Sequence, residues 1–174
     1  NISCLKNHEE IIKTFLNRGV GTIYIPTNNI VYMPVIEKLL VMKKGELCTA
    51  LDSGCRETYL KIKQVDKFDK SIENLRRYIS AAGNDSIIIK YIIVHGYNDN
   101  LEEFKKFMNK MLDINIKIIV VDIDYRDIID GDFTIPKHYY DIIRYAEEFC
   151  KEYHIDLGIP PYTKQVLKQG YSKR

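Results

Sequence analysis

The stretch IIIKYIIV, residues Ile87–Val94, is the most strand-like segment of the chain and decides its class of fold. Its β-branched and aromatic residues are interrupted only by Lys90, and such a composition is typical of a parallel strand buried on both faces. Similar runs predict further strands at Thr22–Pro26, Glu46–Leu51 and Ile116–Ile123.

Segments with helical periodicity separate these strands. One of them repeats apolar residues every three or four positions, at Phe68, Ile72, Leu75 and Ile79. The expected helices are His8–Asn17, Pro34–Met42, Arg56–Ile62, Lys67–Ala81, Leu101–Leu112 and Pro136–Tyr153. Alternating helices and strands predict an α/β fold with a parallel sheet and right-handed crossovers. A doubly wound sheet and a part of a β/α barrel both fit this order.

The boundaries of the fold follow from the same pattern. No linker or low-complexity stretch divides residues 1–153, which we therefore expect to form one domain. Residues 154–174 contain Pro160-Pro161 and are expected to be an irregular C-terminal tail.

Composition excludes several classes of function. The 174 residues are 45% hydrophobic, which is enough for a core, and 26 Lys and Arg nearly balance 24 Asp and Glu. Such a balance argues against nucleic-acid or anionic-membrane partners. Apolar runs such as Ile116–Val121 are too short to span a bilayer, and the first residues lack the pattern of a signal peptide. We expect a cytoplasmic protein.

The cysteines are scattered, at Cys4, Cys48, Cys55 and Cys150. No two of them have the two-residue spacing of a zinc or redox site, so no metal site is predicted. Because the chain shows no secretion signal, we expect free thiols rather than disulfides.

Polar turns follow all four predicted strands. They are Thr27-Asn28-Asn29, Asp52-Ser53-Gly54, His95–Asn100 and Asp122–Arg126. The carboxyl ends of parallel strands lie along one rim, where ligands bind in either architecture. A single polar turn usually only connects elements or caps a helix. Asp122 and Asp124 nevertheless interrupt an apolar strand end without being needed as caps, so the four turns together predict a ligand-binding rim.

Four segments then resemble a known family. They are IYIPTNN (23–29), ALDSGCRETY (50–59), KFDKSIENL (67–75) and GYNDN (96–100). Their order and spacing resemble the later part of radical S-adenosylmethionine (SAM) enzymes, over about Ile11–Tyr153. The resemblance implies a partial β/α barrel in which the four strands correspond to roughly the third to the sixth. Ile2–Leu5 would then be the end of the second strand.

The resemblance also implies cofactors. Members of the family carry a CxxxCxxC loop whose thiolates hold three irons of a [4Fe–4S] cluster, leaving the fourth iron open to SAM. They cleave SAM to a 5′-deoxyadenosyl radical that abstracts hydrogen from a substrate. None of the cysteines here has that spacing, so we expect the parent protein to bind both cofactors and this chain alone to retain neither and to be inactive. The alternative is a non-catalytic half-barrel that binds a small molecule or a protein partner.

The resemblance assigns several rim residues to cofactor binding. It assigns no catalytic residue. Asp52 and Ser53 match the region that contacts the SAM ribose, with Ala50 in place of the usual serine. Arg56 could reach the methionine carboxylate or be a solvated surface arginine, and Val94 lies near the expected adenine. The cofactor-binding candidates are Thr27, Asn28, Asp52, Ser53, Arg56, Val94, Gly96, Asp122 and Asp124.

An incomplete barrel implies partners as well. The missing N-terminal strands would leave an edge strand and an apolar inner face open. We expect the N-terminal part of the barrel, or a second copy in a homodimer, to cover this edge. The alternative is that residues 154–174 cover the gap.

Overall fold

The computed structural model describes residues 7–19, 21–124, 126 and 135–172. The predicted strand end at Ile2–Leu5 and Cys4 lie outside these residues. The strands form one five-stranded sheet: β1 (Ile23–Thr27), β2 (Gly45–Ala50), β3 (Ile87–Ile93), β4 (Ile118–Ile123) and β5 (Asp156–Gly158). The four predicted strands are confirmed, each to within about two residues, as is usual for element ends.

The strands follow one another in chain order across the sheet, and every pairing is parallel. A doubly wound sheet reverses its order at a switch point, and this sheet does not. Because right-handed crossovers that always advance in one direction place their helices on one face, the other face becomes the inner face of a barrel. The partial β/α barrel is confirmed, and the doubly wound alternative is wrong.

The helices agree with the periodicity of the sequence. Their bounds are α1 (His8–Asn17), α2 (Pro34–Val41), α3 (Arg56–Lys63), α4 (Phe68–Ala82), α5 (Leu101–Asp113), α7 (Lys137–Glu152) and α8 (Pro161–Ser172). Local residue preferences and hydrogen bonds determine where several of these helices begin. Pro34 occupies the first turn of α2, and Asn100 caps α5 because its side-chain oxygen accepts from the Glu103 N–H at 3.0 Å.

The core lies between the helices and the outer face of the sheet. In β3 the side chains of Ile87, Ile89, Tyr91 and Ile93 are fully buried. Tyr91 packs against Phe104 and Phe107 of α5, with ring centroids 4.9 and 4.7 Å apart. The alternate residues of β3 are only half-buried. The expectation of a strand buried on both faces is therefore wrong, because no layer of helices from the described residues covers the inner face.

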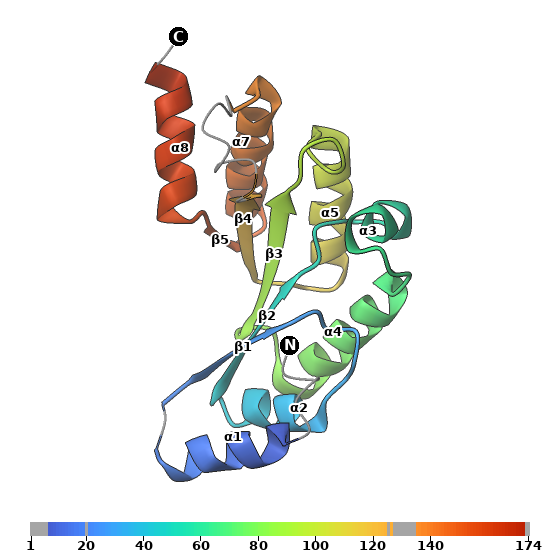
Figure 1. Ribbon diagram of the computed structural model, residues 1–174, viewed down its shortest axis with the longest axis vertical. Helices are drawn as coiled ribbons and strands as arrows, with labels where there is room; N and C mark the ends of the chain where they lie inside the picture. Colours follow the sequence, from blue (N-terminus) through green and yellow to red (C-terminus); the bar gives the residue numbers. More distant parts are fainter. Residues whose placement is uncertain (1–6, 20, 125, 127–134, 173–174) are drawn as a thin grey trace.

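The expectation of an irregular tail is also wrong, since residues 154–174 contain β5 and α8. β5 adds a fifth strand beside β4, and α8 lies at the opposite end of the molecule from α1 (Figure 1). Pro161 does not break this helix, because proline is well suited to a first helical position. The tail thus belongs to the ordered fold.

Within the described residues, no helix combines the length and the apolar character that a membrane crossing requires.

Candidate ligand-binding cavity on the inner face

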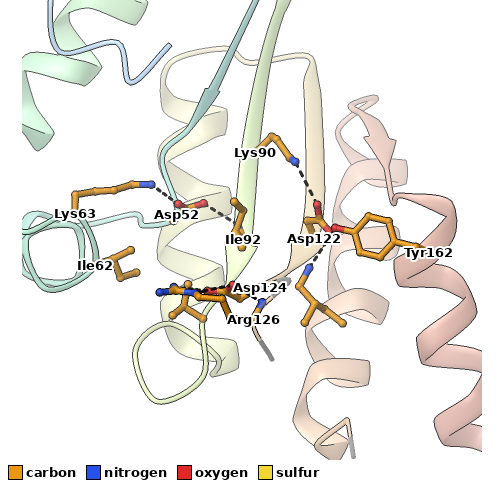
Figure 2. A pocket seen from close by; sticks show the side chains of 11 residues that line it. Asp52, Ile62, Lys63, Lys90, Ile92, Asp122, Asp124, Arg126 and Tyr162 are labelled. Carbon is orange, nitrogen blue, oxygen red and sulfur yellow. Dashed lines mark hydrogen bonds and ion pairs between the residues drawn. The ribbon is translucent and has the colours of Figure 1, made fainter. Parts of the chain in front are cut away.

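A cavity of about 490 Å³ opens at the carboxyl ends of β2, β3 and β4. Its size falls in the range of small-molecule sites. Figure 2 shows acidic and basic side chains reaching it from separate elements. The lining residues are Asp52, Ile62, Lys63, Lys90, Ile92, Val94, Asp122, Ile123, Asp124, Arg126 and Tyr162.

Asp52 forms the β2 side of the cavity. It is buried and has a left-handed backbone, with φ of 57°. One carboxylate oxygen accepts from the Ile92 N–H at 2.7 Å, and the other accepts from the Lys63 ammonium group. Burial raises the pKa of Asp52, while the nearby Lys63, the Ile92 N–H and the charge of Lys90 oppose this shift. The carboxylate therefore joins β2 to β3 beyond the last paired residues.

Asp122 forms the β4 side and connects three elements. Its Oδ1 accepts hydrogen bonds from Thr163 at 2.7 Å and from the Tyr162 hydroxyl, both at the start of α8. Its Oδ2 lies 3.2 Å from the Lys90 Nζ of β3. Burial, together with the hydrogen bond to Asp122, raises the pKa of Tyr162 to about 12. Tyr162 therefore keeps its proton near neutral pH.

Asp124 completes the rim beyond β4. Its backbone N–H donates to the Ile93 carbonyl at 2.9 Å, and its carboxylate accepts from the Arg126 Nε at 3.1 Å. The hydrogen bond from Arg126 lowers the pKa of Asp124. Asp124 is therefore a charged carboxylate at neutral pH, held beside a cation.

Four of the candidates from the sequence meet at this cavity: Asp52, Val94, Asp122 and Asp124. Ser53 does not, because it is fully buried and its hydroxyl bonds to the backbone of Cys55 at 2.6 and 3.0 Å. The adjacent Gly54 lies so close to α5 that an added Cβ would stand 2.1 Å from the Lys106 carbonyl carbon. This part of the turn holds α5 against the sheet.

The remaining candidates also lie outside the cavity. Thr27 and Asn28 each accept a hydrogen bond from a backbone N–H two residues on, as turn residues do. Arg56 pairs with Asp66, with Nε 2.7 Å from Oδ1, on the exposed side of α3. Gly96 has φ of 75°, a conformation that its turn requires and that glycine adopts readily.

Sequence reasoning missed Lys63, Lys90 and Tyr162. Lys90 had a visible signal, since it is the one charge within an apolar strand and shares a face with Ile92 and Val94. Lys63 resembles any surface lysine of a helix, and Tyr162 belongs to the segment expected to be irregular. Only the fold brings these two to the cavity.

The described cysteines do not form a set of cluster ligands. Cys48 lies on β2, Cys55 precedes α3, and Cys150 is buried in α7. Burial raises the pKa of Cys150 to about 11, so this thiol is protonated at neutral pH. No three His, Cys, Asp or Glu side chains among the described residues lie together as a metal site would require. These residues do not fit a [4Fe–4S] cluster.

Comparison with known proteins gives matches in structure alone. No protein-family model matches the chain, and no curated protein does. SuiB from Streptococcus suis matches with a TM-score of 0.67 and 11% identity, over 92% of this chain and 37% of SuiB. A radical SAM methyltransferase from Sphaerobacter thermophilus matches with a TM-score of 0.56 and 15% identity, over 83% of this chain and 42% of that one.

A third match has a similar length. A domain of pyruvate-formate lyase-activating enzyme from Bacteroides vulgatus matches with a TM-score of 0.64 and 14% identity, over 87% of this chain and 88% of that domain. The chain thus spans well under half of SuiB and of the methyltransferase, and most of the shorter domain. With sequence identities this low, the matches establish a likeness of fold and nothing further. The chain thus shares its fold with these proteins, among them a radical SAM methyltransferase.

Proposed function

We propose that this chain is the C-terminal part of a radical SAM enzyme and that its inner-face cavity contacts SAM. The observation that carries the proposal is the position of the cavity, at the carboxyl rim of a singly wound parallel sheet, where barrel enzymes bind their ligands. Support comes from the matching fold of SuiB, whose structure is also known with SAM bound.

The lining of the cavity suits the parts of SAM. Ile62, Ile92 and Val94 offer an apolar surface to a purine, and the buried carboxylates Asp52 and Asp122 offer acceptors to hydroxyl groups. Lys63 and Lys90 offer donors to a carboxylate. In such enzymes, bound SAM would supply, after one-electron reduction by the cluster, the 5′-deoxyadenosyl group that takes hydrogen from a substrate. This chain's residues bind and orient it, while Tyr162 holds its proton on the phenolic oxygen and fixes Asp122.

We assign the cluster ligands to residues of a longer protein that precede Asn1. The described cysteines do not fit the cluster, and the chain spans only 37% of SuiB. The alternative is a non-catalytic half-barrel that binds a small molecule or a protein partner. The coding sequence upstream of Asn1 distinguishes the two. A CxxxCxxC motif supports the enzyme, and a start codon directly before Asn1 supports the half-barrel.

The open edge of β1 would receive the preceding strands. The Ile23 N–H donates to the Lys44 carbonyl on the β2 side at 2.9 Å, so by alternation Tyr24 and Pro26 direct their backbone groups outward. Tyr24 is exposed, as are Ile11 and Phe15 on α1, the helix that leads into β1. When this chain is alone in solution, we propose that a second copy of it pairs with the same edge of β1.

The sequence alone led us to expect no SAM on this chain, but the cavity offers contacts of its own, so we propose weak, saturable binding of SAM without the cluster. Equilibrium dialysis with SAM tests the proposed function. The double variant Lys90→Met/Asp122→Asn removes an ion pair of the cavity without changing the net charge. Lys70→Met/Glu73→Gln is the matched control, because that pair lies exposed on α4. We expect saturable binding to the wild type and the control, and binding about tenfold weaker to the cavity variant. Absence of saturable binding, or equal binding by both variants, would contradict the proposal.

A further inference from the structure

The three ion pairs at the cavity all have the same orientation. In each pair the carboxylate is the less exposed partner and the cation the more exposed one. The side chains of Asp52 and Lys63 are 3% and 26% exposed, and those of Asp122 and Lys90 are 6% and 30% exposed. Asp124 and Arg126 repeat the pattern at the rim, with 12% and 81%. Although the three pairs sum to zero charge, a ligand in the cavity meets mainly the cations.

The lysines have hydrogen-bonding capacity left for such a ligand. A lysine ammonium group carries three N–H donors and no acceptor. Lys63 donates to Asp52, and Lys90 donates to Asp122. Within the part of the chain that the structure describes, one donor is used in each pair and two remain on each ammonium group. The carboxylates behind them hold both lysine side chains in place, so that little side-chain entropy remains to be lost on binding.

The two ammonium groups act on the same space. Lys63 comes from the end of α3 and Lys90 from the middle of β3, and Figure 2 shows both reaching toward the carboxylates of the cavity. The positive charge of Lys90 also acts on Asp52, the partner of Lys63. Ile62, Ile92 and Val94 border this basic part of the wall and can hold the uncharged remainder of a ligand.

We infer that the cavity is specific for a ligand carrying a carboxylate or phosphate group, which accepts hydrogen bonds from Lys63 and Lys90. Oxygen anions accept the strongest hydrogen bonds from ammonium groups, and a cationic group would be repelled at the same place. This inference deepens the proposed function and rests on it in taking the cavity as the ligand site. The anionic group comes either from the methionine end of SAM or from the substrate.

Titration with inorganic phosphate at constant ionic strength tests the inference, with the amide chemical shifts of Ile92 and Val94 as the readout. The variants are Lys63→Met/Asp52→Asn and Lys90→Met/Asp122→Asn, each of which removes a pair and leaves the net charge unchanged. Lys70→Met/Glu73→Gln is again the control. We expect saturable shifts in the wild type and control, and binding about tenfold weaker in each cavity variant. Thermal melting of every variant identifies any that fails to fold, and the wild-type titration then decides alone.

Competition identifies the source of the anionic group. If phosphate competes with SAM and not with methylthioadenosine, which lacks the carboxylate, then the lysines hold the methionine end. If SAM and phosphate bind together, the lysines serve the substrate. Either result supports the inference. Saturable SAM binding without any phosphate-induced shift at Ile92 and Val94 would overturn it and leave the proposed function standing. Loss of SAM binding alone would overturn only the proposed function.

Discussion

The two faces of β3 differ although their residues alternate along one strand. On the outer face, Ile87, Ile89, Tyr91 and Ile93 are fully buried against helices. On the inner face the half-buried residues include Lys90, Ile92 and Val94, and all three line the cavity. Successive residues of this one strand therefore alternate between packing against the helices and lining the cavity.

The difference shows how an open barrel separates stability from binding. The outer face gains its stability from apolar burial, which increases with the area removed from water. The inner face carries charged pairs that are expensive to bury and add little net stability. Charges retained at such a place are better explained by a ligand than by folding, and substitutions on the two faces should therefore have different effects.

The largest difference is expected from matched isoleucine truncations in β3. Ile89→Ala on the outer face should lower the free energy of unfolding by about 2–5 kcal/mol, because it leaves a cavity in a packed core. Ile92→Ala on the inner face should lower it by about 1 kcal/mol, since that side chain is already half exposed. Urea denaturation measures both. Equal losses would mean that the inner face is packed as the outer face is.

The next effect concerns the contact between the inner face and α8. Asp122→Ala removes the acceptor shared by Tyr162, Thr163 and Lys90, so the free energy of unfolding should fall by about 2–3 kcal/mol. Amide hydrogen exchange should become faster in α8 and remain slow in α5. Asp156→Ala, an exposed aspartate on β5, is the control and should change neither quantity. Unchanged exchange in α8 would show that Asp122 does not hold that helix.

A smaller effect is the pH dependence set by Asp52. Because burial raises its pKa above 3.8, the folded chain binds more protons than the unfolded chain between the two pKa values. The free energy of unfolding therefore falls as the pH rises through this window, by about 1.4 kcal/mol for each unit of the shift. Urea denaturation from pH 3.5 to 7, about the range of carboxyl titration, should show this fall in the wild type and not in Asp52→Asn.

Asp99 provides the control of opposite sign. Burial alone would raise its pKa, but the Gly96 N–H and His138 outweigh burial and lower it. Its contribution to stability is therefore present above the unfolded pKa and is lost as the pH falls through the folded one. Asp99→Asn should therefore remove the part of the fall in the free energy of unfolding at acid pH that Asp99 causes. If Asp52→Asn and Asp99→Asn altered the pH profile in the same direction, the assignment for Asp52 would be wrong.

The smallest effect is expected at the open edge of the sheet. We predict weak self-association through β1, because among the described residues no strand pairs with its outward backbone groups or covers the exposed Tyr24. Tyr24→Lys should reduce the dimer seen by sedimentation velocity at concentrations on the order of tens of micromolar. Tyr97→Lys, which changes an equally exposed tyrosine in the turn after β3, should not. A wild-type chain that sediments as a monomer throughout would contradict the prediction.

The fold could be predicted from the sequence wherever local signals were strong. The β-branched run Ile87–Val94 and the apolar stripe of α4 are strong local signals, and their bounds agree with the structure to within one residue. β5 could not be predicted, because Asp156–Gly158 is too short to show a period and contains a glycine. The order of the strands in the sheet depends on contacts between distant segments, so the pattern alone left two architectures open.

The site was predictable in its carboxylates and in Val94. Asp52, Asp122 and Asp124 follow strand ends, and their polarity is visible in the sequence. Ser53 belongs to the same motif, yet it is buried in the packing beneath α5. Lys63 and Tyr162 come from helices whose placement at the cavity depends on the whole sheet. Motif position therefore predicts a rim, while burial decides which rim side chains face a ligand.

Chemical-shift mapping of isoleucine methyl groups with SAM tests the central claim most directly, namely that the inner face binds the ligand and the outer face does not. Ile62 and Ile92 line the cavity, while Ile89 and Ile119 are fully buried on the outer face. We predict saturable shifts of the Ile62 and Ile92 methyl signals and no shift of the Ile89 and Ile119 signals. Shifts confined to the outer-face methyl groups, or no saturable shift at Ile62 and Ile92, would contradict the account.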